Sequence, residues 1–228
     1  FKLRALLLFI LLTCFLTASL YAQQKKYRFY AEKMGSPFML IIGDKNGTID
    51  SAQALSMFEQ SIHLVDSFNH IISDYDNGSN ISLINKNAGI QSVQMHPVLE
   101  EILLIGKRAY QQTTGQYNIV IGPLSQLWRK ARKTKEFPDS KQIKKALSKI
   151  AFEDIKIDTI NHQVFLSQIG MQLDFGSLGK GYVAQKVINF LKTKGVNYAL
   201  VDAGGKIVTC STDTLFWQVG INQIRDHQ

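Results

Sequence analysis

The feature that most constrains this chain is the stretch 174–185, DFGSLGKGYVAQ, in which three glycines and a lysine fall within six positions. A P-loop needs four residues between its first glycine and its Gly-Lys pair, followed by Ser or Thr. Here only two residues separate Gly176 from Gly179, and Gly181 follows the lysine. The order of the gaps also reverses that of the dinucleotide fingerprint G-x-G-x-x-G. The loop therefore belongs to neither of these nucleotide-binding classes.

The residues around this loop indicate a strand, a glycine-rich turn, a helix and a second strand. MQLDFG (171–176) and YALVDAGG (198–205) are the expected strands, and the helix is expected over 182–194, ended by Gly195. This order places Lys180 at a helix N-terminus, where backbone N–H groups and the helix dipole favour an anion such as phosphate. The alternative is that the glycines only permit a tightly packed strand-to-helix turn.

The rest of the chain mixes helical and alternating patterns, which predicts an α+β fold. No linker rich in Pro, Gly or Ser divides residues 23–228, so one domain is expected there. The expected elements are strands at 27–33 and 38–43 joined by a turn at 34–37, helices at 51–73 and 97–115, a further helix in the basic segment with Ser140 as its N-cap, and a hairpin over 155–168 that turns at 159–162.

Residues 1–22 have the pattern of a secretory signal peptide. Lys2 and Arg4 precede an apolar run over 5–20, and Ala22 supplies a small residue for cleavage. A membrane anchor is the alternative, although the run is shorter than the roughly 20 residues that a spanning helix needs. Export would leave Cys210 as the one cysteine after cleavage, so no internal disulfide is expected and the hydrophobic core must hold the domain.

The formal net charge of +8 is concentrated in one segment. Nine Lys and Arg residues lie within 129–149, beside only two acidic residues. A solvated helix and loop is the expected interpretation, and a surface for an acidic partner is the alternative. Nucleic acid is not expected as a partner, because aromatic residues do not alternate with these charges as they do in single-strand binders.

Five stretches, in this order, resemble motifs of the ApbE-type FAD:protein FMN transferases: MGSPF, SDYDNGSNISLIN, GQYNIVIGPLSQLW, DFGSLGKGYVAQ and ALVDAGGKI. The resemblance implies an α+β, ApbE-like domain of the T-fold-related kind over residues 23–228, with mixed sheets and packed helices. It also implies that the domain is incomplete at its C-terminal end. The family's H-x-x-D-P-x-T-G and A-D-A-x-x-T segments have no counterpart before Gln228.

The resemblance further implies a site for FAD and Mg²⁺. It assigns cofactor contacts to Met34, Tyr75, Gln116, Tyr117, Asn118, Asp174 and Lys180, and a metal contact to the backbone of Ser177. Met34 and Tyr75 would contact the flavin, and Asp174 and Lys180 would lie at the diphosphate. A magnesium ion on the phosphate oxygens would neutralise charge that grows as the pyrophosphate is cleaved. The catalytic residues remain unassigned, because the family's general base is expected past residue 228.

The activity implied by the resemblance is Mg²⁺-dependent transfer of FMN from FAD to a Ser or Thr hydroxyl of an exported or membrane redox protein, with release of AMP. The expected location is the periplasm or the periplasmic face of the inner membrane, and association with a membrane surface is a further expectation. Asn118, Gln185 and Lys206 stand where the family usually has Asp. These departures leave two alternatives open, a non-catalytic flavin-binding protein and a metal-dependent FAD pyrophosphatase.

Overall fold

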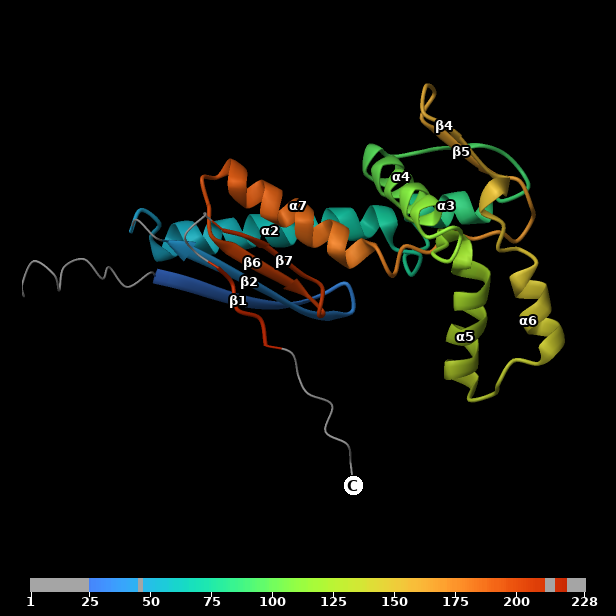
Figure 1. Ribbon diagram of the computed structural model, residues 1–228, viewed down its shortest axis with the longest axis horizontal. Helices are drawn as coiled ribbons and strands as arrows, with labels where there is room; N and C mark the ends of the chain where they lie inside the picture. Colours follow the sequence, from blue (N-terminus) through green and yellow to red (C-terminus); the bar gives the residue numbers. More distant parts are fainter. Residues whose placement is uncertain (1–24, 45–46, 212–215, 221–228) are drawn as a thin grey trace, which may run out of the picture.

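A computed structural model of the chain describes residues 25–44, 47–211 and 216–220, so the predicted leader at 1–22 lies outside the described residues. The labels below are those of Figure 1. In chain order the elements are β1 (Lys25–Lys33), β2 (Ser36–Asp44), α2 (Ser51–Ile72), α3 (Asn80–Lys86), β3 (Val93–Gln94), α4 (Pro97–Gln112), the 3₁₀ turn η1 (Ile119–Ile121), α5 (Gly122–Thr134), α6 (Ser140–Leu147), the 3₁₀ turn η2 (Phe152–Asp154), β4 (Ile155–Asp158), β5 (Gln163–Leu166), α7 (Gly179–Thr193), β6 (Ala199–Ala203) and β7 (Ile207–Cys210).

The larger sheet has the order β1-β2-β6-β7, and every pairing in it is antiparallel. β1 and β2 form a hairpin whose turn consists of Met34 and Gly35, both with positive φ (53° and 68°). Positive φ at both central residues matches the right-handed twist of the strands. The turn is tighter than the predicted 34–37, because Ser36 and Pro37 already belong to β2.

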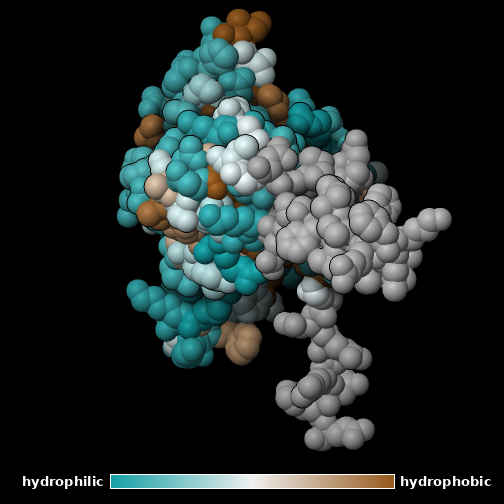
Figure 2. Space-filling view, turned by 90° about the vertical axis from the view of Figure 1, so that its left-hand side faces the viewer, coloured by the Kyte–Doolittle hydropathy of each residue, from teal (hydrophilic) through white to brown (hydrophobic). Residues whose placement is uncertain are grey.

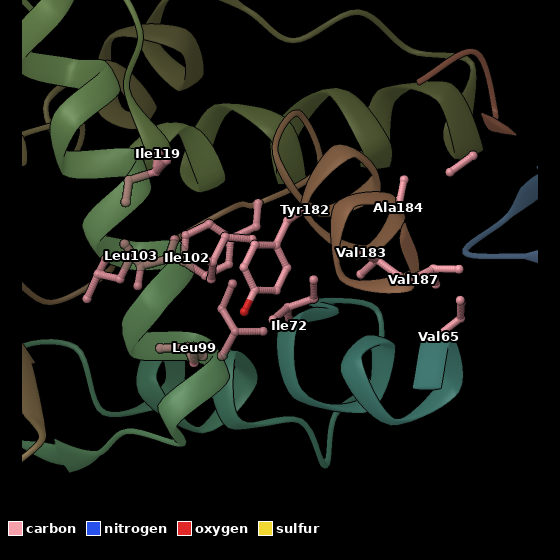
Figure 3. Packing of buried hydrophobic residues seen from close by; sticks show 14 of the residues in the cluster. Val65, Ile72, Leu99, Ile102, Leu103, Ile119, Tyr182, Val183, Ala184 and Val187 are labelled. Atoms are coloured by element: carbon pink, nitrogen blue, oxygen red, sulfur yellow. The ribbon is translucent and has the colours of Figure 1, made fainter. Parts of the chain in front are cut away.

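Helices α2 and α7 lie together over one face of this sheet (Figure 1). Apolar residues recur every three or four positions along α2, as the helical pattern predicts, and of these Val65 and Ile72 are buried, whereas Leu55 near the start of the helix is 46% exposed. Val183 of α7 is buried with Val65 and Ile72. Figure 3 shows the Tyr182 ring of α7 beside Ile72 and pointing toward the apolar side chains of α4. One continuous core therefore joins the sheet layer to the helices of the second part of the fold.

That second part contains α3, α4, α5, α6 and a small antiparallel sheet with the order β3-β5-β4. The predicted hairpin over 155–168 is confirmed as β4 and β5. α4 packs closely on η1, since a Cβ added to Gly106 would lie 2.8 Å from Ile119. Together with the larger sheet, this arrangement confirms the predicted α+β class.

Helices α5 and α6 form a hairpin that projects from the rest of the molecule (Figure 1). The basic segment thus has a helix on each side of the break at 135–139. The N-cap of α6 is Asp139 and not Ser140, which is the first helical residue. Asp139 accepts a hydrogen bond from the backbone of Gln142, and the Gln142 side chain accepts one from the backbone of Asp139. This capping box stabilises the start of the helix better than Ser140 alone would.

The prediction of a strand at 171–176 is wrong. The backbone N–H of Leu173 donates to the side chain of Asn85 (2.7 Å), and that of Asp174 donates to the carbonyl of Ile119 (2.8 Å). The carbonyl of Gln172 accepts from the N–H of Gly122 (3.1 Å). Because these groups bind a side chain and a turn, the segment is an extended connection between the two parts of the fold. Its hydrogen bonds fix the position of Asp174.

The predicted helix boundaries agree with the structure to within a few residues. α7 begins at Gly179, three residues before the predicted start, which brings Lys180 into its first turn; Gly195, with φ of 83°, follows its end. Cys210 is a buried free thiol. No helix in the described part of the chain has the length and apolarity needed to cross a membrane.

Candidate functional site

A cavity of about 970 Å³ lies where the two parts of the fold meet. Its walls come from the β1–β2 turn, the end of α2 with the loop 73–75, helix α5, the loop 174–177 and the first turn of α7. Several of these segments are far apart in the sequence. The cavity therefore depends on the packing of α2, α5 and α7 as a unit, and its size suits a ligand larger than a single phosphate.

Five of the residues assigned by resemblance line this cavity together: Met34, Tyr75, Asp174, Ser177 and Lys180. Met34 comes from the strained β1–β2 turn, and Tyr75 comes from the loop after α2, with 75% of its surface exposed. Asp174 is buried at 6% exposure. The cavity thus offers an exposed aromatic ring, a thioether, a buried carboxylate and a cation, although the binding role of each residue stays a prediction.

The other three assigned residues are not among those that line the cavity. Gln116 is exposed, and Asn118 caps η1 by accepting a hydrogen bond from the backbone of Val120 (2.9 Å). Tyr117 is connected to the site, because its hydroxyl and that of Ser177 are 2.7 Å apart. Burial raises the pKa of Tyr117, the hydrogen bond with Ser177 opposes this, and the charge of Asp174 adds to it. At neutral pH Tyr117 is therefore a neutral hydroxyl that steadies the 174–177 loop.

Arg129 of α5 joins three groups of the cavity. Its Nη1 donates to Asp74 Oδ2 (2.6 Å), its Nη2 donates to Asp174 Oδ2 (3.1 Å), and its guanidinium carbon lies 4.0 Å from the centre of the Tyr75 ring. Burial lowers the pKa of Arg129, but the hydrogen bond and charge of Asp74 and the charge of Asp174 outweigh it and raise that pKa. The guanidinium is thus a permanent charge between two buried carboxylates.

Sequence reasoning missed the roles of Arg129 and Asp74. It grouped Arg129 with the solvated basic segment. A signal was present, because Asp74 and Asp174 both lie in stretches assigned to one site. Two carboxylates expected in one cavity need a cation or a metal nearby. Sequence reasoning could not select Arg129 among nine basic residues, because it lies 55 positions from Asp74 and 45 from Asp174.

The glycines of the 174–185 stretch differ in what surrounds them. A Cβ on Gly176 would lie 2.9 Å from Asp174 Oδ1, and one on Gly179 would lie 3.2 Å from Ile72. Gly181 has no such neighbour within 4 Å. Close packing therefore explains Gly176 and Gly179. Lys180 lies in the first turn of α7 and lines the cavity, so an anion site at this helix N-terminus stays a prediction.

The described residues do not make a complete magnesium site. Both oxygens of Asp174 are in use, Oδ1 by the N–H of Gly176 (2.7 Å) and Oδ2 by Arg129. Asp74 is held by Arg129 and by Gln126 (3.1 Å). Among the described residues, no group of three or more His, Cys, Asp or Glu side chains is placed to hold a metal. Mg²⁺ relies on carboxylates and substrate phosphates, so this donor set alone does not fit it.

None of the three departures from the family pattern is among the residues that line the cavity; Asn118 caps η1, and the other two side chains are exposed. Gln185 is exposed on α7, where its amide donates to Asn189 (2.9 Å). Lys206 is exposed in the turn between β6 and β7. Neither side chain contacts the groups that line the cavity in a described interaction. These two substitutions therefore give no argument against ligand binding at the site.

Comparison with protein families gives a match between residues 34–228 and the family model described as "ApbE family". A relative from Klebsiella pneumoniae, named FAD:protein FMN transferase, is 28% identical over 202 residues, which are 89% of this chain and 60% of that protein. One of the same name from Treponema pallidum is 26% identical over 190 residues, 75% of this chain and 51% of that protein. The chain thus spans between half and two thirds of the length of these relatives.

Solved structures show the same fold. The flavin transferase ApbE from Vibrio cholerae superposes with a TM-score of 0.76 at 17% identity, over 87% of this chain and 64% of that one. The ApbE protein from Thermotoga maritima gives 0.77 at 18% identity, over 90% and 65%. The expectation of an ApbE-like fold is confirmed by these similarities.

Proposed function

The chain belongs to the ApbE family, and from this premise we propose that its protein transfers FMN from FAD to a hydroxyl group of an acceptor protein and releases AMP. One observation carries the proposal. Met34, Tyr75, Asp174, Ser177 and Lys180, drawn from three separate motifs, line one cavity of about 970 Å³. The names of the relatives support the same reaction.

In the proposed reaction the oxygen of a Ser or Thr hydroxyl attacks the phosphorus of the FMN half of FAD. The bond between that phosphorus and the bridging oxygen breaks, and AMP leaves with the bridging oxygen and the electron pair. The hydroxyl proton passes to a general base, for which no described residue is proposed. Lys180 and the first turn of α7 would stabilise the phosphate charge that develops during the step.

A requirement for Mg²⁺ is part of the proposal and is supported by the resemblance. Because the described residues do not form a complete site for this ion, the proposed steps involve only groups of the chain and of the two substrates. What the described residues supply is the cavity, the exposed ring of Tyr75 and the positive charge of Lys180.

The test is an incubation of the purified protein with FAD, Mg²⁺ and an acceptor domain. We expect stoichiometric AMP and a covalent flavin on the acceptor, detected by mass spectrometry and in-gel fluorescence. Free FMN without an adduct would select the alternative pyrophosphatase activity. FAD binding with neither product would select a non-catalytic flavin-binding protein. Absence of FAD binding would reject all three.

We also propose that the protein is exported to the periplasm, with residues 1–22 as its signal peptide. The support is the charged start, the apolar run and the small residue at position 22. N-terminal sequencing of the protein from the periplasmic fraction should begin at Gln23. A protein that keeps residues 1–22 in the membrane fraction would instead favour the anchor.

For the acceptor we propose a redox protein of the membrane, reached by a molecule that itself associates with the membrane surface. The α5–α6 hairpin supports this, because seven of its Lys and Arg side chains are exposed and Phe137 at its tip is 88% exposed. Basic residues beside an exposed aromatic ring are typical of proteins that bind the surface of anionic bilayers. Figure 2 shows the left-hand side of Figure 1, away from the hairpin, where the coloured surface is mostly hydrophilic with scattered apolar residues.

A further inference from the structure

Tyr75 is unusual among the residues of the cavity because it is both exposed and fixed. The residue is 75% exposed and lies in the loop after α2. An exposed side chain of this kind normally samples several rotamers. Here the guanidinium of Arg129 covers one face of the ring at 4.0 Å from its centre. That stacking holds the ring while leaving its other face open.

Arg129 is itself held by two carboxylates that are nearly buried. The Arg129 side chain is 18% exposed, and the side chains of Asp74 and Asp174 are 9% and 8% exposed. The two hydrogen bonds use different nitrogens of the guanidinium, so they fix the plane of the group as well as its position. The Gln126 amide, one turn earlier on α5, adds a second hydrogen bond to Asp74.

The two carboxylates come from different walls of the cavity. Asp74 follows α2, and Asp174 begins the 174–177 loop, where it also accepts a hydrogen bond from the N–H of Gly176. A single guanidinium on α5 therefore ties three segments together and presents the ring of Tyr75 from their junction. Nothing in this set of contacts requires a ligand, so the ring is placed before the ligand arrives.

We propose that Arg129 is a positioning residue, which holds the Tyr75 ring so that its open face can receive the planar ring of a flavin. This inference rests on the proposed function, because it takes FAD as the ligand. It adds a residue that the motifs do not assign and that acts through Tyr75 and not by touching the ligand.

Lysine cannot replace arginine in this role. An ammonium group keeps the charge but lacks the planar fork that binds two carboxylates and stacks on a ring. Arg129→Lys should therefore keep one positive charge beside the two carboxylates but release the ring of Tyr75. Fixing a side chain in advance saves an ordering cost that corresponds to about threefold to tenfold in affinity. We expect the substitution to weaken FAD binding by that factor.

The experiment is a double-mutant cycle on FAD affinity, measured by quenching of flavin fluorescence at constant ionic strength with the full chain. The four proteins are the unsubstituted chain, Arg129→Lys, Tyr75→Leu and the double variant. If Arg129 acts through Tyr75, Arg129→Lys should weaken binding in the first background and change it by less than about twofold when Tyr75 is absent. Lys130→Gln, which removes a charge at an exposed position next to Arg129, is the control for a general charge effect of this part of α5 and should bind FAD as the unsubstituted chain does.

Equal losses from Arg129→Lys in both backgrounds would overturn the inference, since Arg129 would then act directly on the ligand or through folding. Unchanged affinity in Arg129→Lys would overturn it as well. In both of these cases the unsubstituted chain still binds FAD, so the proposed function would stand. Failure of the unsubstituted chain to bind FAD would reject the proposed function and this inference together.

Discussion

Lys180 is the described residue on which the proposed phosphate contact most depends. It lies in the first turn of α7 and lines the cavity, where its charge and the helix dipole have the same sign. A hydrogen bond to a charged group contributes about 1.5–3 kcal/mol, so Lys180→Gln should weaken FAD binding by roughly tenfold to a hundredfold. Isothermal titration calorimetry at two salt concentrations measures the loss and its screening.

Lys206→Gln is the matched control, because it removes the same charge from an exposed turn outside the cavity wall. We expect it to change FAD affinity by less than about twofold, as is usual for a distant, screened charge. If both substitutions weaken binding equally, net charge and not a contact at α7 governs the affinity.

Gly122, at the start of α5, controls the backbone that carries Asp174. A Cβ at this position would lie 2.5 Å from the carbonyl oxygen of Gln172, a backbone atom that cannot move alone. Gly122→Ala should therefore displace the 172–174 segment and lower the free energy of unfolding by about 1–3 kcal/mol. Urea denaturation measures the loss, and FAD affinity should fall with it.

Gly181→Ala is the control for that substitution, since Gly181 lies in α7 with no neighbour within 4 Å of the added Cβ. It should raise the free energy of unfolding by up to about 1 kcal/mol, because alanine favours the helix. If the Gly122→Ala protein is as stable as the Gly181→Ala protein, the 172–174 segment can move aside without lowering the free energy of unfolding.

The connection between α4 and α7 should make stability depend on pH. Glu101 of α4 accepts from Tyr182 (2.9 Å) and Lys186 (2.6 Å) of α7. Burial raises the pKa of Glu101, but the hydrogen bonds from Lys186 and Tyr182 and the charge of Lys186 outweigh it, so this pKa lies below its usual 4.5. A lowered pKa means that Glu101 stabilises the fold above about pH 4.5 and loses this contribution as pH falls through the folded pKa.

Glu101→Gln should therefore be less stable than the unsubstituted protein at pH 7, and the difference should vanish in acid. Glu101 is 49% exposed, so screening limits the effect to below about 1 kcal/mol. Urea titrations between pH 3 and pH 7 measure it, and Lys186→Gln should remove most of the same pH dependence. A difference that is constant over this range would contradict the assignment.

Elements whose signals are local could be predicted from the sequence. The stripe of α2 recurs every three or four residues, and Gly195 marks the end of α7 through its positive φ. The 171–176 segment could not be predicted, because its alternation resembles a strand while its hydrogen-bond partners are a side chain and a turn elsewhere in the chain. The site followed the same rule: Lys180 lies in a motif, whereas the pairing of Arg129 with Asp74 and Asp174 exists only after folding.

At the scale of the whole molecule, charge is distributed unevenly. Seven exposed Lys and Arg side chains lie on the projecting α5–α6 hairpin, whose Trp128 and Arg129 also line the cavity. The rings of Trp128 and Phe137 pack edge to face with their centres 6.1 Å apart, and this contact helps to hold Phe137 at the tip of the hairpin. A surface that approaches the hairpin therefore also approaches the mouth of the cavity, as a membrane acceptor protein would require.

Residues 23–228 should accordingly bind vesicles that contain phosphatidylcholine and the anionic lipid phosphatidylglycerol, and they should dissociate from these vesicles as the salt concentration is raised. Each lysine near such a surface contributes about 1 kcal/mol, so Lys141→Gln, Lys144→Gln and Lys145→Gln together should weaken binding roughly a hundredfold. Substituting Lys192, Lys194 and Lys206, three exposed lysines elsewhere, removes the same charge and should have a much smaller effect. Co-sedimentation with the vesicles measures the binding of both triple variants.

Equal losses in the two triple variants would show that net charge governs the binding, and equal binding to pure phosphatidylcholine would show that the attraction is not electrostatic. A hairpin variant that keeps its affinity while Phe137→Ser loses it would show that the apolar tip, and not the lysines, holds the protein at the bilayer.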